Sequence, residues 1–328
     1  MVKEIQVNSF LRFLGQGISE PALVLADDFQ KYILKTQKVV VGGEREHYNC
    51  MFLNEILSYK LAQHLDVPIP DAAIAFIDPR LIENDREIVF VHKFEEGYFF
   101  ASQELENIED NLRDNYQQMI AMGKPWIKRT WNAFFDNIKN TEDIAKIIAF
   151  DLLIANFDRY RNQGNLLIAN TEEGRKVFAI DHGHAFFGPI WTNEKIQNMR
   201  QVSLTQQYVN YFTDCVLSVN RDQVDGLGLV FNAIQPKIDL TDVKNHSFMN
   251  IIAEIEHINE HIIDSFFEGI PQEWFVEYNM QMTTYKDFLL KQKSLVRHII
   301  QSLMNRNAFT NSVGGVLHWI DEKRAGTV

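Results

Sequence analysis

The chain has 328 residues, of which 46% are hydrophobic, which is enough for one large two-lobed domain or two ordinary domains. Its formal net charge of −12 argues against broad binding to nucleic acid or to an anionic membrane, but leaves room for a local basic pocket that takes phosphates. Two distant cysteines, Cys50 and Cys215, without zinc-site spacing, and the lack of an apolar run of signal-peptide or transmembrane length, favour a cytoplasmic protein.

The first part of the chain predicts short strands separated by turns. Residues 22–34 indicate two strands joined at Asp27-Asp28, and Lys35 follows the second of them. Upstream, Gly15, Gly17 and Ser19 lie in a loop whose backbone N–H groups could contact phosphates. The alternatives are an ordinary turn for the glycines and a lysine that blunts an edge strand for Lys35.

An amphipathic helix is predicted over residues 49–65, because leucines recur there at four-residue spacing: Leu53, Leu57, Leu61 and Leu65. Glu55 lies off that row. It either serves a functional site or is an ordinary solvated carboxylate of the helix surface. After the helix, residues 72–77 and 87–93 predict two more strands around a turn at Asp78-Pro79-Arg80.

Mixed polar residues from 99 to 140 predict helices and loops of a second lobe. A helix is expected over residues 142–156, with Asp151 bracing the loop that follows it through hydrogen bonds. Apolar residues in helical register predict core helices at 250–268 and 284–304. A short apolar patch at residues 316–320 is expected to dock on the body of the protein or on a partner.

The most informative stretch is residues 151–187, DLLIANFDRYRNQGNLLIANTEEGRKVFAIDHGHAFF. Two apolar runs, 166–168 and 177–180, flank a turn, so the stretch predicts a helix, a loop and a hairpin whose second strand ends at Asp181. Asp158, Asn162 and Asn165 lie in the loop. Side-chain oxygens gathered at the ends of a hairpin favour a Mg²⁺ site completed by substrate phosphates.

The pattern D-R-x-x-x-x-x-N-L-L, followed by an apolar strand ending in I-D-H-G, resembles the catalytic and metal-binding segments of HipA-like kinases. The resemblance implies an α+β, two-lobed protein-kinase-like fold. Its small antiparallel β-rich N-lobe would span residues 1–97, and its larger, mainly helical C-lobe residues 98–328. It also implies ATP and Mg²⁺ as cofactors and transfer of phosphate to an alcohol group, most often on a protein Ser or Thr.

The same resemblance implies roles for single residues. Asp158 matches the catalytic base, and Asp181 the metal-binding Asp. Asn165 matches the metal-binding Asn, with Asn162 as its rival. Arg159, beside the base, would pair with Asp181 or a phosphate, and its alternative is a surface arginine. Tyr160 departs from the family, in which many relatives carry a His.

In the N-lobe, the resemblance implies that Gly15, Gly17 and Ser19 cover the nucleotide and that Glu55 holds Lys35 against its phosphates. The link between the lobes would pass near Phe94–Tyr98, where backbone groups could bind adenine.

Two other classes stay open: a small-molecule kinase of the same fold, and a nucleotide-binding pseudokinase that acts as a binding module. The implied partners are ATP, a protein substrate and an antitoxin-like regulatory protein, with no direct nucleic-acid contact and no membrane.

Overall fold

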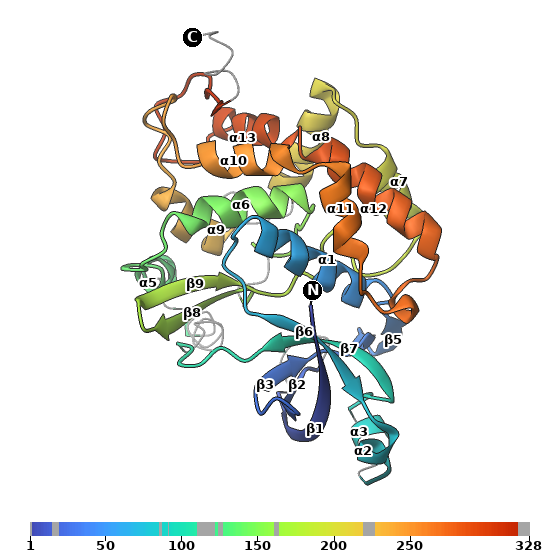
Figure 1. The fold of residues 1–328 in the computed structure, drawn as a ribbon. Coiled ribbons are helices and arrows are strands. Elements are labelled where there is room, and N and C mark those ends of the chain that lie inside the picture. The colour runs from blue at the N-terminus through green and yellow to red at the C-terminus, as the bar shows by residue number, and fades with distance from the viewer. Residues whose placement is uncertain are drawn as a thin grey trace.

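The computed structural model describes residues 2–14, 20–84, 87–90, 92–109, 122–123, 127–160, 164–218 and 227–320. It has two lobes, a β-rich one at the bottom of Figure 1 and a helical one at the top, so the α+β two-lobed prediction is confirmed. Their apolar side chains form two separate buried clusters.

The N-terminal lobe is a closed five-stranded barrel in the order β1-β2-β3-β7-β6. The strands are β1 (Lys3–Phe13), β2 (Ala22–Ala26), β3 (Lys31–Leu34), β6 (Ala72–Ile77) and β7 (Gly97–Gln103). All neighbours are antiparallel except β1 and β6, which run parallel. Strand β1 was not predicted, although Ile5 and Val7 alternate with polar residues there and are buried.

A second hairpin, β4 (Lys38–Val41) with β5 (Glu44–His47), precedes helix α1 (Met51–His64). Helix α1 lies between the lobes and is buried on two sides. Its leucine row packs into the helical core, whereas Phe52, Ile56 and Tyr59 pack into the barrel core. The predicted helix is therefore present, and it joins the two cores.

The strand predicted over residues 87–93 is wrong. After β6 the chain forms α2 (Pro79–Asn84) and α3 (Glu87–Phe90), because a short apolar run does not by itself distinguish a strand from a buried helix. Phe94 is fully buried among Phe10, Phe13 and Phe99, and the chain after it forms a strand of the same barrel, so the link between the lobes does not lie near Phe94–Tyr98. Strand β7 completes the barrel instead, and the first lobe extends through Gln103 rather than ending at residue 97.

The helical lobe carries the hairpin β8 (Leu166–Thr171) and β9 (Gly174–Ala179) on its side facing the barrel. Its helices are α5 (Ile127–Phe134), α6 (Asp143–Leu153), α7 (Asn193–Arg200), α8 (Gln206–Ser218), α9 (Leu229–Ile234), α10 (Met249–His257), α11 (Glu260–Phe267), α12 (Tyr278–Gln292) and α13 (Val296–Asn305), with 3₁₀ turns η1 (Gln235–Lys237) and η2 (Gln272–Trp274). The stretches 250–268 and 284–304 each contain parts of two helices, where single helices were expected.

The segment after α13 packs on the body of the protein. Leu317 and Trp319 are buried, and the Trp319 ring meets the edge of His246 at 4.9 Å between centroids. Among the described residues, no helix is both long and apolar enough to cross a membrane.

Candidate active site

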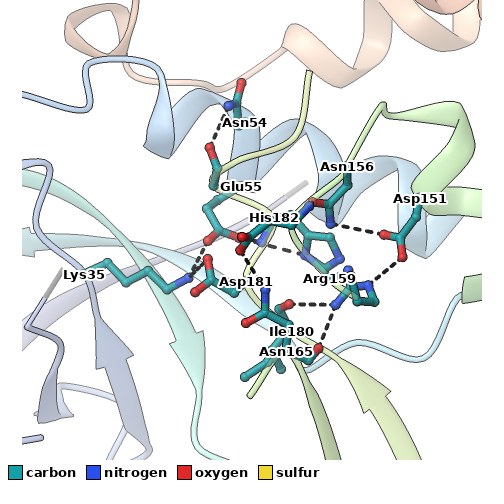
Figure 2. Close-up of polar contacts among 12 residues, drawn as sticks. Lys35, Asn54, Glu55, Asp151, Asn156, Arg159, Asn165, Ile180, Asp181 and His182 are labelled. Atoms are coloured by element: carbon teal, nitrogen blue, oxygen red, sulfur yellow. Dashed lines mark hydrogen bonds and ion pairs between the residues drawn. The ribbon is translucent and has the colours of Figure 1, made fainter. Parts of the chain in front are cut away.

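Lys35 lies between two carboxylates that come from different elements. Its Nζ atom is 2.5 Å from Oε1 of Glu55 on α1 and 2.9 Å from Oδ1 of Asp181, which follows β9 (Figure 2). Strand β3 ends at Leu34, directly before the lysine, so the barrel aims this side chain at α1. The pair of Lys35 and Glu55, which the resemblance to HipA-like kinases implied, is therefore formed.

The charges of this triad determine its protonation. Burial alone would lower the pKa of Lys35, but Asp181 and Glu55 outweigh it, and the pKa stands above its ordinary value. Burial raises the pKa of Glu55, an effect that Lys35 partly offsets. For Asp181, the charge of Lys35 outweighs burial and lowers the pKa to about 2. Asp181 is thus an anion at neutral pH.

The loop between α6 and β8 brings Asp158 to the same place. Nδ2 of Asn165 donates to Oδ2 of Asp158 at 3.0 Å, and the N–H of Ile180 donates to the Asn165 carbonyl at 3.1 Å. The second bond places Asn165 beside the residue that precedes Asp181. The predicted Asp158, Asn165 and Asp181 therefore gather at one end of the β8–β9 hairpin.

Arg159 requires a correction. It is fully buried and donates from Nε to Oδ2 of Asp151 at 2.7 Å, not to Asp181. Its Nη1 donates to the carbonyls of Asn165 at 2.6 Å and of Ile180 at 2.9 Å. A guanidinium enclosed in this way cannot reach a phosphate, so Arg159 ties the Asp158 loop to the strand ends. Asp151 braces the loop as expected, and also accepts a hydrogen bond from Asn156.

The D-H-G turn is held by close contact with α1. Asp181 has the left-handed backbone angle φ of 61°, which short polar residues tolerate better than most. The N–H of His182 donates to Glu55 at 3.1 Å, and its buried ring meets Phe150 edge-on. At Gly183 a Cβ atom would lie 2.6 Å from Cγ of Met51, so a side chain there would clash with α1.

Burial, together with the positive charges of Arg159 and Lys35, lowers the pKa of His182 well below its ordinary value. The ring is therefore neutral. It occupies an enclosed position next to Glu55.

Of the remaining predicted site residues, Gly15, Gly17, Ser19 and Asn162 lie outside the described residues. Phe94 belongs to the barrel core and not to the cleft. In the described ranges no group of three His, Cys, Asp or Glu side chains could hold a metal ion by itself. A site of one carboxylate and one amide, completed by substrate phosphates, is what Mg²⁺ commonly uses.

Sequence reasoning missed a buried polar group next to this site: Asn54, Lys195 and Tyr285, on α1, α7 and α12. Asn54 directly precedes Glu55 in a helix that is apolar on two sides, and a single polar residue there gives no periodic signal.

The two lobes, the lysine held by a helix Glu, and the Asp-Asn and Asp-x-Gly segments together define the kinase class of phosphotransferases. A family model described as HipA-like kinase matches residues 7–224, which is more than half of the chain. The chain belongs to the HipA-like kinase family.

A solved structure agrees on the fold, and two others are similar at lower TM-scores. The proinflammatory kinase CtkA of Helicobacter pylori is 13% identical with a TM-score of 0.52, and the match covers 96% of this chain and 100% of that one. HipA of Shewanella oneidensis, solved with HipB and operator DNA, is 13% identical with a TM-score of 0.36, over 82% of this chain and 60% of that one.

The Golgi casein kinase with Mn and ADP bound is 10% identical with a TM-score of 0.42, over 96% of this chain and 75% of that one. At 13% identity, the likeness to CtkA concerns the fold alone. A search of curated proteins finds no match.

Proposed function

We propose that this protein is an ATP- and Mg²⁺-dependent kinase that phosphorylates Ser or Thr hydroxyls of a protein. One observation carries the proposal: Lys35 is held between Glu55 and Asp181 at 2.5 and 2.9 Å, with the Asp158–Asn165 pair at the end of the same hairpin. Membership of the HipA-like kinase family supports it.

Each side chain has a role that its position allows. The Lys35 side chain is 12% exposed and Asp181 is 35% exposed, so both can meet a ligand, whereas Glu55, at 3%, serves to hold the lysine. Lys35 would contact nucleotide phosphates and offset their charge. Asp158 would orient the acceptor hydroxyl and take its proton as the oxygen bonds to the γ-phosphorus and the bond to ADP breaks.

The oxygen donors of the site fit Mg²⁺. Asp181 offers a carboxylate and Asn165 an amide oxygen, and both are hard ligands. Nδ2 of Asn165 is committed to Asp158, which directs the amide oxygen of Asn165 away from that carboxylate. Bound there with the phosphates, the metal would supply positive charge to the transferred group.

The test measures transfer of label from γ-labelled ATP with Mg²⁺ to casein, to histone and to a cell lysate. Asp158→Asn should lower the rate by about 10²–10⁴-fold, because a positioned base contributes that much. Asp136→Asn is the matched control, since that carboxylate is 60% exposed and contacts Lys237 in the helical lobe. Asp136→Asn should transfer like wild type.

Nucleotide binding without transfer to any protein would contradict the protein-kinase proposal. Small alcohols would then be tested as acceptors, and failure with these too would leave a nucleotide-binding module. Transfer by Asp158→Asn at the rate of Asp136→Asn would remove Asp158 as the base.

A further inference from the structure

The side chain of Asn54 is fully buried in the first turn of α1, and the proposed chemistry does not use it. Its Nδ2 atom donates to three backbone carbonyls of the segment that follows Asp181. The distances are 2.7 Å to Gly183, 2.9 Å to Ala185 and 3.0 Å to Gly188. One side chain of the helix thus binds the segment at three points over six residues.

The oxygen of the same amide faces donors. The hydroxyl of Tyr285 on α12 donates to Oδ1 at 2.7 Å, and the ammonium of Lys195 on α7 lies 3.3 Å from it. Lys195 also donates to the Gly188 carbonyl at 2.6 Å and lies over the Tyr285 ring. Carbonyls on one side and donors on the other allow only one orientation of the amide.

This arrangement joins helices α1, α7 and α12 to the segment that follows Asp181. Glu55, the next residue of α1, accepts a hydrogen bond from the His182 N–H and holds Lys35 (Figure 2). The N-terminus of α1 adds a bond from the Cys50 N–H to the Pro189 carbonyl at 2.8 Å. A shift of α1 relative to residues 183–188 would therefore move Glu55 relative to Asp181.

We propose that Asn54 is a positioning residue, whose amide locks α1 to the segment Gly183–Gly188 and so keeps Glu55 where it holds Lys35. Tyr285 and Lys195 orient that amide from the helical lobe. This inference rests on the proposed kinase function, because the consequence of the lock is the placement of Lys35 for phosphate transfer.

Asn54→Asp is the sharpest test, because it keeps the shape and the oxygen that faces Tyr285 and Lys195 but removes both N–H donors. Gln292→Glu is the matched control. Gln292 is also a fully buried amide, and its Nε2 donates to the Leu152 carbonyl at 2.8 Å, away from α1. Tyr285→Phe is a milder variant that removes only the hydroxyl bound to Asn54.

Two quantities are measured for each folded variant: amide hydrogen exchange of residues 182–188, and the kcat and KM for ATP in phosphate transfer. Asn54→Asp should raise exchange across 182–188 at least tenfold relative to Gln292→Glu. It should lower kcat by about 100-fold, as small misplacements of catalytic groups do, with a smaller change in KM. Tyr285→Phe should also raise exchange and lower kcat, but by smaller factors.

Equal exchange and equal kcat in Asn54→Asp and Gln292→Glu would overturn the inference, because the amide would then be an ordinary buried group. If Asn54→Asp does not fold, Tyr285→Phe decides by the same two quantities. If wild type transfers no phosphate, the proposed function fails, and exchange at residues 182–188 alone decides whether Asn54 locks the segment.

Discussion

Lys35 and Arg159, two cations near the site, differ in what they can contact. Lys35 is partly exposed and faces Asp181, which is also partly exposed. Arg159 is fully enclosed, and its carboxylate partner Asp151 is 1% exposed. Both cations attract carboxylates strongly, but only Lys35 can meet a nucleotide. Burial, rather than the identity of the side chain, separates the residue proposed to contact the nucleotide from the one that serves the scaffold.

The Arg159–Asp151 pair predicts a large loss of stability when one partner is removed. Asp151→Asn leaves a buried guanidinium without a counter-charge and should lower the unfolding free energy by about 3–5 kcal/mol. The exposed pair of Asp78 and Arg80, in which the arginine side chain is 80% exposed, is the control, and Asp78→Asn should cost far less stability than Asp151→Asn. Urea denaturation measures both.

A double-mutant cycle completes this test. Asp151→Leu with Arg159→Met should cost less than the sum of the two single changes, because the double variant buries no unpaired charge. Strict additivity would show that the two side chains do not depend on each other.

Lys195 predicts a pH dependence of stability. Burial lowers its pKa from 10.5 to about 8 in the folded state. Below pH 8 the folded and unfolded chains both hold the proton, and between pH 8 and 10.5 the unfolded chain binds more protons. The unfolding free energy therefore rises with pH in that window, by about 3 kcal/mol for this group.

Lys195→Met isolates the contribution of this lysine. Cys50 and Tyr285 face Lys195, and burial raises the pKa of both, so their titration acts in the opposite direction. Subtracting the variant's unfolding free energy from that of wild type at each pH removes this background. A difference that stays flat between pH 8 and 10.5 would contradict the lowered pKa.

At the scale of elements, the close contact between α1 and the D-H-G turn explains why residue 183 is glycine. A Cβ atom there would lie 2.6 Å from Cγ of Met51 and 3.4 Å from Oε1 of Glu55. Gly183→Ala should cost about 1–3 kcal/mol of unfolding free energy, as overpacking does. Combining it with Met51→Ala should recover part of the loss measured for the two single variants. If the costs of the two single variants simply add, the added Cβ atom does not clash with Met51.

Local patterns predicted the elements that carry the site. Strands β2, β3, β6, β8 and β9 are short apolar runs between turn residues and helix α1 has leucine spacing, and the structure has them. Helix α3 was mistaken for a strand because Ile88, Val89 and Phe90 suit either structure. The mistaken strand displaced the expected link between the lobes to Phe94, which in fact packs in the barrel core.

The features that the sequence did not predict depend on contacts between distant segments. Arg159 next to Asp158 suggests a phosphate ligand, and only its enclosure by Asp151 and two carbonyls assigns it to the scaffold. Asn54 is similar, since its five polar neighbours come from residues 183 to 285. No spacing within α1 contains that information.

At the scale of the whole molecule, the barrel and the helical lobe meet along α1 and the site lies where they meet. A further contact comes from Trp274 of the helical lobe, which packs in the barrel core with its ring centroid 5.3 Å from that of Phe52. Because Lys35 belongs to the barrel and Asp181 to the helical lobe, a ligand that contacts both residues ties the lobes together.

This geometry predicts that Mg²⁺ and ATP stabilise the whole molecule. At a ligand concentration one hundred times the dissociation constant, the unfolding free energy should rise by about 2.7 kcal/mol. Lys35→Met and Asp181→Asn should each lose most of this gain, compared with their own ligand-free states, because each removes a group from one side of the cleft. Lys286→Met, on the outer face of α12 beside Glu260 and Asp264, should keep it. Denaturant unfolding with and without Mg²⁺ and ATP gives each difference. An equal gain in all three variants would mean that the nucleotide binds away from the Lys35–Asp181 cleft.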